Sequence, residues 1–416
     1  MRKFFIVWTG QAFSLFGSAL VQFALVWWLT KSTGSATVLA MATLVALLPQ
    51  VLAGPFIGVL VDRWDRKRIM IVADISIALV TAGLVVLFVA GLVRPWHIYL
   101  AALARGVGQT FHLPAMQAAT SLLVPKEHLA RVAGLNQGLQ GAISVAAPPL
   151  GALALGVLPV PAVLAVDIVT AAIAVSCLAA VAIPRPEPSA AGAAAPGRRG
   201  VLADMAAGFR YLWAWPGLIL LLGMAAILNF FLLPTQSLLP ILVVKHFSGG
   251  AMQLSWLQAA MGVGLVAGGI ALGAWGGFKR RILTSLLGVS LAGAGIGSIG
   301  LIPGGMISAA VALMFVAGAA LSLANGPLFA IMQATVAKDM QGRVFTLLGS
   351  VGGAMMPVGL AVAGPVADAI GVRPWYIVAG VVTVAMAVAA LFVPPLMGIE
   401  EQASKRAKGQ QAREAP

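Results

Sequence analysis

The chain has 416 residues, of which 60% are hydrophobic and only 9% are charged, and its mean hydropathy is +1.00. Soluble domains carry about 25% charged residues, so this composition excludes a soluble globular protein and indicates an integral membrane protein. The net charge of +14 calls for no nucleic-acid partner, because basic loops at a bilayer surface attract anionic lipid.

Twelve apolar segments are long enough to cross a bilayer, which takes about 20 helical residues. They are separated by charged residues or by glycine and proline. Their predicted limits are 4–30, 38–61, 69–93, 96–124, 129–158, 162–183, 218–244, 253–278, 283–302, 308–336, 344–370 and 375–393. The sequence therefore predicts an all-α membrane protein with twelve transmembrane helices.

The distribution of basic residues predicts the orientation of these spans. If the first residue lies in the cytoplasm, 21 of the 26 lysine and arginine residues fall in cytoplasmic segments. Four fall in outside loops, and Arg105 falls within a span. Because cytoplasmic loops are enriched in basic residues, we expect a multi-pass protein of the cell membrane with both termini in the cytoplasm.

The second half of the chain repeats features of the first at a constant shift. Pro114 and Pro161 recur 213 residues later as Pro327 and Pro374. Such a shift predicts two pseudo-symmetric six-helix bundles related by an axis along the membrane normal.

We expect the two bundles to cover residues 1–183 and 215–395. Prolines end the sixth span, and the Ala/Gly-rich segment after them is typical of a linker. Residues 184–214 therefore form a predicted cytoplasmic linker with a short amphipathic surface helix, or a disordered linker as the alternative. Residues 396–416 form a basic cytoplasmic tail.

A dense group of charges separates the second and third predicted spans. Six charged residues lie between positions 62 and 68, and each would cost about 2.5–3.5 kcal/mol at the centre of a membrane helix. The chain must therefore leave the membrane here. A generic basic loop would account for Arg66 and its basic neighbours, whereas Gly58 followed four residues later by Asp62 indicates a more specific loop signature.

Three of the ionisable residues inside predicted spans are candidates for moving protons. They are Asp74, Arg105 and Asp167. An acid in a low-dielectric site tends to be neutral, and a nearby arginine favours its charged form, so such an acid can load and release a proton. Two alternatives remain open: Arg105 as a buried tie to a neighbouring helix, and Asp74 as a partner of the basic loop.

Uncharged polar residues and one histidine also occur within the spans and are candidates for lining a substrate cavity. They are Gln11, Ser14, Ser18, Gln22, Gln109, His112, Asn229, Gln236 and Asn325. The first four lie on one face of the first span, and Gln109 and His112 share a face with Arg105. The alternative is that they form hydrogen bonds between packed helices.

Several of these motifs together resemble the proton-driven drug exporters of the major facilitator superfamily, most closely the macrolide efflux permeases. The likeness is densest at Trp8-Thr-Gly-Gln11, at Gly58-Val-Leu-Val-Asp62-Arg63-x-Asp65-Arg66, at Arg105-x-x-Gly108, and at Gly342-Arg343-Val-Phe345. It runs over most of the chain.

The resemblance implies roles for individual residues. Gly58, Asp62 and Arg66, with Arg343, fall on the loop motif that braces the two halves, and Arg105 falls on the arginine that the family links to proton movement. Pro148 and Gly151 fall on the helix-bending motif of antiporters. Ala147 and Ala152 replace glycines of that motif, which leaves uniport as an alternative to antiport.

The resemblance implies an exporter of an amphipathic drug, a macrolide, in exchange for protons by alternating access. We expect the protein to be a monomer. The proton gradient is the expected energy source, with no cofactor and no metal. A siderophore or lipid-precursor exporter is the alternative on the same fold. A membrane-embedded enzyme or sensor is the alternative of another class, but the sequence holds no HExxH, GxSxG or P-loop pattern.

Overall fold

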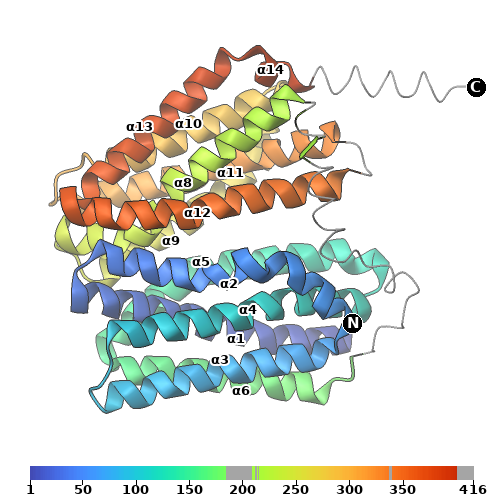
Figure 1. The fold of residues 1–416 in the computed structure, drawn as a ribbon, viewed down its shortest axis with the longest axis vertical. Helices are drawn as coiled ribbons and strands as arrows, with labels where there is room; N and C mark the ends of the chain where they lie inside the picture. Colours follow the sequence, from blue (N-terminus) through green and yellow to red (C-terminus); the bar gives the residue numbers. More distant parts are fainter. Residues whose placement is uncertain (184–208, 211–212, 214, 337–339, 401–416) are drawn as a thin grey trace, which may run out of the picture. The chain divides into compact units, whose positions relative to one another are not determined.

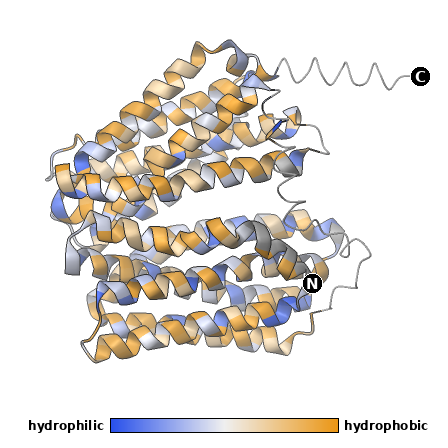
Figure 2. Cartoon of the chain, in the orientation of Figure 1, coloured by the Kyte–Doolittle hydropathy of each residue, from blue (hydrophilic) through white to orange (hydrophobic). Residues whose placement is uncertain are grey.

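A computed structural model describes residues 1–183, 209–210, 213, 215–336 and 340–400. Every regular element in these ranges is a helix (Figure 1). Apolar residues run along the whole length of the helices, and hydrophilic ones gather toward their ends (Figure 2). The predicted amphipathic helix of the linker and residues 401–416 of the basic tail lie outside the described ranges.

Six long helices form the first half of the chain. They are α1 (Arg2–Thr33), α2 (Ala36–Arg63), α3 (Arg66–Val89), α4 (Pro95–Leu123), α5 (Leu129–Val157), which follows the short 3-10 helix η1 (Lys126–His128), and α6 (Val160–Ala180).

The second half contributes six more long helices. They are α8 (Pro216–Lys245), α9 (Ala251–Trp275), α10 (Arg281–Ile299), α11 (Ile307–Thr335), α12 (Gln341–Ile370) and α13 (Val372–Leu391), followed by the single turn α14 (Pro394–Met397).

These helices confirm the predicted all-helical membrane fold, with ends that differ from the predicted limits by a few residues. Eleven of the twelve long helices in the described ranges carry a segment apolar and long enough to cross a membrane. The exception is α4, which carries Arg105, Gln109 and His112. Helix α4 is less apolar because some of its polar side chains make contacts inside the protein.

The described helices belong to two compact units, which we treat separately. Unit 1 comprises residues 1–195 and 238–259, and unit 2 comprises residues 196–237 and 260–416. In unit 1, α1 packs against α5 and α6, and α3 packs against α4 and α6. In unit 2, α10 contacts both α11 and α13.

The charged loop between α2 and α3 is a tight connection. α2 ends at Arg63 and α3 begins at Arg66, so only two residues lie between them. Asp65 caps α3, because its side chain accepts hydrogen bonds from the backbone N–H groups of Lys67 (3.0 Å) and Arg68 (3.2 Å). The acid that precedes the basic triplet therefore starts the third helix.

Glycines bring helices of unit 2 into backbone contact. A Cβ atom on Gly380 of α13 would lie 2.3 Å from the Cα of Gly297 on α10. A Cβ atom on Gly318 of α11 would lie 2.1 Å from the carbonyl oxygen of Met261 on α9. Only glycine permits such an approach, which is a common way to pack helices in membranes.

Candidate functional site

A buried ion pair connects α4 and α6 in unit 1. Arg105 Nη1 donates to Asp167 Oδ2 over 2.6 Å, with 11% of the arginine side chain and 1% of the aspartate side chain exposed. Ser18 donates to Asp167 Oδ1 (2.8 Å), and Thr81 lies 2.9 Å from Oδ2. We call these four residues the Asp167 layer. All four helices that they come from, α1, α3, α4 and α6, thus meet at one carboxylate.

A second acid lies two helical turns away. Gln11 Nε2 donates to Asp74 Oδ2 over 2.9 Å, and His112 Nε2 lies 3.4 Å from Asp74 Oδ1. All three side chains are buried. Gln11, Asp74 and His112 form what we call the Asp74 layer, which joins α1, α3 and α4.

The helical repeat explains why these residues form two layers. Gln11 and Ser18 are seven residues apart on α1, Asp74 and Thr81 on α3, and Arg105 and His112 on α4. Seven residues are almost two turns, so each pair shares a helix face, with a rise of about 10 Å between its members.

The two layers contain all three predicted proton-coupling residues. Arg105 and Asp167 lie in one layer, and Asp74 lies in the other. Arg105 ties α4 to α6, as in the structural alternative. Asp74 faces Gln11 and His112, and not the basic triplet of the loop. Ser18, Gln11 and His112, predicted to line a cavity, bind or face buried acids. The role of each in transport stays a prediction.

Sequence reasoning missed Thr81. This residue is completely buried, and its Oγ1 lies 2.6 Å from Arg105 Nη1 and 2.9 Å from Asp167 Oδ2. The available signal was its spacing, because Thr81 is a polar residue seven positions after Asp74 in an otherwise apolar helix.

The remaining candidates on α1 and α4 do not join these layers. Ser14 is buried between them on α1, whereas Gln22 and Gln109 are exposed on the surface of unit 1. Gln109 shares the helix face of Arg105 only at its edge, where its side chain stays accessible.

Unit 2 contains a cavity of about 300 Å³ that brings together the three candidates of the second half. Asn229, Gln236 and Asn325 all line it, along with mostly aliphatic side chains of α8, α10 and α11. Gln236 Nε2 contacts Met261 Sδ at 2.7 Å, and Asn229 donates to the carbonyl oxygen of Ala225 in its own helix. The cavity lining carries amide groups and no charged side chain.

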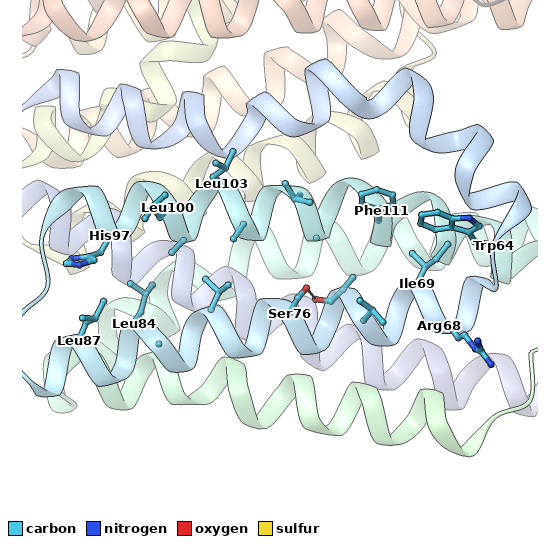
Figure 3. Close-up of a pocket in the computed structure, with 18 of the residues that line it drawn as sticks. Trp64, Arg68, Ile69, Ser76, Leu84, Leu87, His97, Leu100, Leu103 and Phe111 are labelled. Atoms are coloured by element: carbon cyan, nitrogen blue, oxygen red, sulfur yellow. Dashed lines mark hydrogen bonds between the residues drawn. The ribbon is translucent and has the colours of Figure 1, made fainter. Parts of the chain in front are cut away.

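A larger hollow of about 1240 Å³ runs along the outside of α3 and α4 (Figure 3). Leu84 and Leu87 of α3 and Leu100 and Leu103 of α4 line one part of it, and Trp64 and Phe111 stack at one end, with ring centroids 6.3 Å apart. Its lining is almost wholly apolar and suits acyl chains.

The loop-motif residues are described only in part. Arg66 Nη1 donates to the carbonyl oxygen of Ala118 (3.3 Å). Gly58 and Asp62 lie near the end of α2 and Arg343 in the first turn of α12, but their surroundings lie outside the described part. The brace between the two halves therefore stays a prediction.

Helix α5 continues through Pro148 and Pro149. Gly151 is buried, and a Cβ atom there would lie 3.0 Å from the ring of Phe23 on α1. The predicted bend at Pro148 and Gly151 stays a prediction, but the glycine has a packing reason. Within the described ranges, no group of three or more His, Cys, Asp or Glu side chains could hold a metal ion.

Comparisons with known proteins agree over most of the chain. The model of the Major Facilitator Superfamily matches residues 7–360. The chain is 34% identical over 388 residues to the "Macrolide efflux protein A" of Streptococcus pyogenes, covering 93% of this chain and 94% of that protein. It is 26% identical over 399 residues to the "Multidrug efflux pump Tap" of Mycolicibacterium fortuitum, covering 92% and 94%.

Solved structures share the fold at low sequence identity. A bacterial homologue of the human lysosomal transporter Spinster superposes with a TM-score of 0.70 at 15% identity, over 97% of both chains. The nucleoside transporter NupG superposes with a TM-score of 0.68 at 13% identity, over 93% of this chain and 98% of that one.

Proposed function

The chain belongs to the Major Facilitator Superfamily, and from this premise we propose that it exports an amphipathic drug of the macrolide class in exchange for protons. The observation that carries the substrate assignment is its 34% identity to a macrolide efflux protein over 93% of the chain. The similarity to a multidrug efflux pump supports export of a drug-like molecule.

The buried ionisable residues of unit 1 support proton coupling. Asp74, Arg105 and Asp167 lie within membrane helices, where a charge is costly unless it has a partner or a function. In our proposal, protonation and drug binding favour different states of an alternating-access cycle. Coupling requires this difference, because a ligand with equal affinity for both states shifts nothing.

The drug would contact uncharged polar groups. The amide side chains of Asn229, Gln236 and Asn325 line the cavity of unit 2, and the exposed Gln22 and Gln109 of unit 1 offer two more amides. A cavity of about 300 Å³ is too small for a whole macrolide, so we propose that it takes one part of the molecule.

In our proposal, the protein acts as a monomer in the cell membrane, with both termini in the cytoplasm. Support for this orientation comes from the 21 of 26 basic residues that then face the cytoplasm. The proton gradient supplies the energy, and we propose no cofactor.

Accumulation of radiolabelled erythromycin in cells tests this function. Cells that express the protein should accumulate less label than cells with an empty vector, and a protonophore should abolish the difference. Equal accumulation in both cell types at verified expression would contradict the macrolide assignment. Lower accumulation that resists the protonophore would contradict proton coupling.

A further inference from the structure

The two acid layers of unit 1 differ in how the negative charge is compensated. In the Asp167 layer, a guanidinium group lies 2.6 Å from the carboxylate, and two hydroxyl groups lie within 2.9 Å of it. Opposite charge and hydrogen bonds both favour an ionised carboxylate. Asp167 therefore has a cation and two hydroxyl groups in place to compensate a negative charge.

The Asp74 layer has no such compensation. One neutral amide donates to Asp74 Oδ2, and within the described residues no lysine or arginine side chain binds Asp74. Gln11 Oε1 and His112 Nε2 are buried atoms without a hydrogen-bond partner. A buried carboxylate with only neutral donors is costly, and so are buried polar atoms left without partners.

The charged and titratable groups around this layer are engaged elsewhere or neutral. On α3, Lys67 Nζ donates to the carbonyl oxygens of Ala179 and Val181 at the end of α6, at 2.9 and 2.8 Å. On α4, Arg105 pairs with Asp167. From α6, the thiol Cys177 packs beside Gly10, next to Gln11, as a small uncharged side chain.

Apolar packing separates the two layers. Ile77 lies midway between Asp74 and Thr81 on α3 and is 4% exposed. It packs against Gly108, midway between Arg105 and His112 on α4, where an added Cβ atom would lie 2.9 Å from Ile77 Cγ1. Within the described residues no hydrogen bond joins the layers, so a proton can bind in one layer without passing to the other through a hydrogen bond.

We infer that the Asp74 layer is a separate proton-binding site, in which one proton lies between Asp74 Oδ1 and His112 Nε2, whereas the Arg105–Asp167 pair stays ionised throughout. The inference rests on the proposed proton exchange and names the site that performs it. One added proton gives either a neutral acid that donates to the imidazole or an imidazolium that donates to the carboxylate. Both forms give His112 Nε2 the hydrogen bond that it lacks.

Proton release during drug binding tests the assignment directly. Purified protein in weakly buffered detergent solution receives erythromycin, and a pH indicator dye records the protons released per drug bound. Asp74→Asn should lose most of this release, and His112→Gln should reduce it by more than half. The matched control is Ser76→Ala on α3, whose hydroxyl bonds the carbonyl oxygen of Ala73 in its own helix, and it should release protons like the wild type.

A second measurement separates proton binding from folding. In proteoliposomes, Asp74→Asn should retain exchange of unlabelled for labelled drug at equilibrium, and should lose the response of net transport to a pH gradient. If Asp74→Asn does not fold, the same two measurements on His112→Gln decide. Wild-type-like proton release in the folded variants would overturn the inference, while absence of release in the wild type would instead overturn the proposed proton exchange.

Discussion

The cores of the two units use different chemistry at corresponding positions. In unit 1, Arg105 and Asp167 hold α4 and α6 together through a buried ion pair. The residues 213 positions later, in the register of the internal repeat, are Gly318 and Gly380. In unit 2 each of these glycines instead lies against the backbone of another helix, Gly318 against α9 and Gly380 against α10, so the two positions carry close steric contacts in place of charges.

This difference shows which contacts the fold requires and which are specific to unit 1. Unit 2 packs its helices without an ion pair at these positions, so the architecture does not require one. A buried ion pair is weak evidence for stability, because the cost of desolvating two charges offsets their attraction. The charges of unit 1 are therefore better explained by a task of that unit than by folding, and substitutions in the two cores can test the contrast.

The largest effect is expected from Arg105→Met in unit 1. The variant leaves Asp167 buried and 1% exposed without its cation, which costs about 3–5 kcal/mol. We expect the thermal midpoint in detergent to fall strongly and the yield of monodisperse protein to drop. Gln109→Met, one turn further along the same helix at an exposed position, is the control and should behave like the wild type. Equal stability of both variants would show that the ion pair is not held as described.

Gly380→Val disrupts the contact between α13 and α10 in unit 2. The new side chain would meet the Cα of Gly297 at 2.3 Å and the carbonyl oxygen of Gly293 at 2.6 Å, and backbone atoms cannot rotate away. Overpacking of this kind costs about 3 kcal/mol at the upper end of its usual range. The thermal midpoint measures it. Gly223→Val on α8, where an added Cβ atom meets nothing within 4 Å, serves as control, and a similar loss in both would point to helix propensity instead of packing.

The double substitution Arg105→Met with Asp167→Leu makes unit 1 more like unit 2. Removing both charges avoids the unpaired acid, and replacement of a buried ion pair by apolar residues is often neutral. We expect the double variant to regain most of the stability lost in Arg105→Met, to within about 1 kcal/mol of the wild type. A double variant as unstable as the single one would mean that the pair itself stabilises the unit.

Among the single substitutions, the smallest effect is expected from Ser18→Ala. It removes one of the hydrogen bonds to Asp167, at 2.8 Å, and leaves the arginine in place. Loss of a hydrogen bond to a charged group costs about 1.5 kcal/mol. Ser176→Ala on α6, whose exposed hydroxyl bonds the carbonyl oxygen of Ala172 in its own helix, should change the thermal midpoint less. The reverse order of the two midpoints would contradict the geometry of the Asp167 layer.

The fold could be predicted because the bilayer imposes simple rules. A span predicted at 129–158 is observed as α5 (Leu129–Val157), and one predicted at 96–124 is observed as α4 (Pro95–Leu123). Charged residues, glycines and prolines between apolar segments mark the ends of such helices, whichever helices pack beside them. The family resemblance, based on the charged loop and on Arg105, is confirmed by the match over residues 7–360.

The partners within the site could not be predicted in the same way. Arg105, Asp74 and Asp167 stood out because charges are rare in spans, but their pairing depends on how α3, α4 and α6 pack. A single sequence contains no distances between helices, so Asp74 could equally have reached the basic loop. Thr81 was missed because one hydroxyl in an apolar helix usually bonds its own backbone, as Thr81 does with the carbonyl oxygen of Ile77 (3.0 Å).

The polarity of α4 also has a consequence for biogenesis. Alone among the twelve long helices in the described ranges, α4 is not apolar enough to count as a span by composition, and the acid that neutralises its arginine comes 62 residues later in the chain. The ribosome must synthesise α5 and much of α6 before that partner exists. We therefore expect α4 to stay bound to the insertion machinery until α6 is made, and to enter the lipid together with α6. The helices α1 to α6 would then assemble as a group, after α6 has been synthesised.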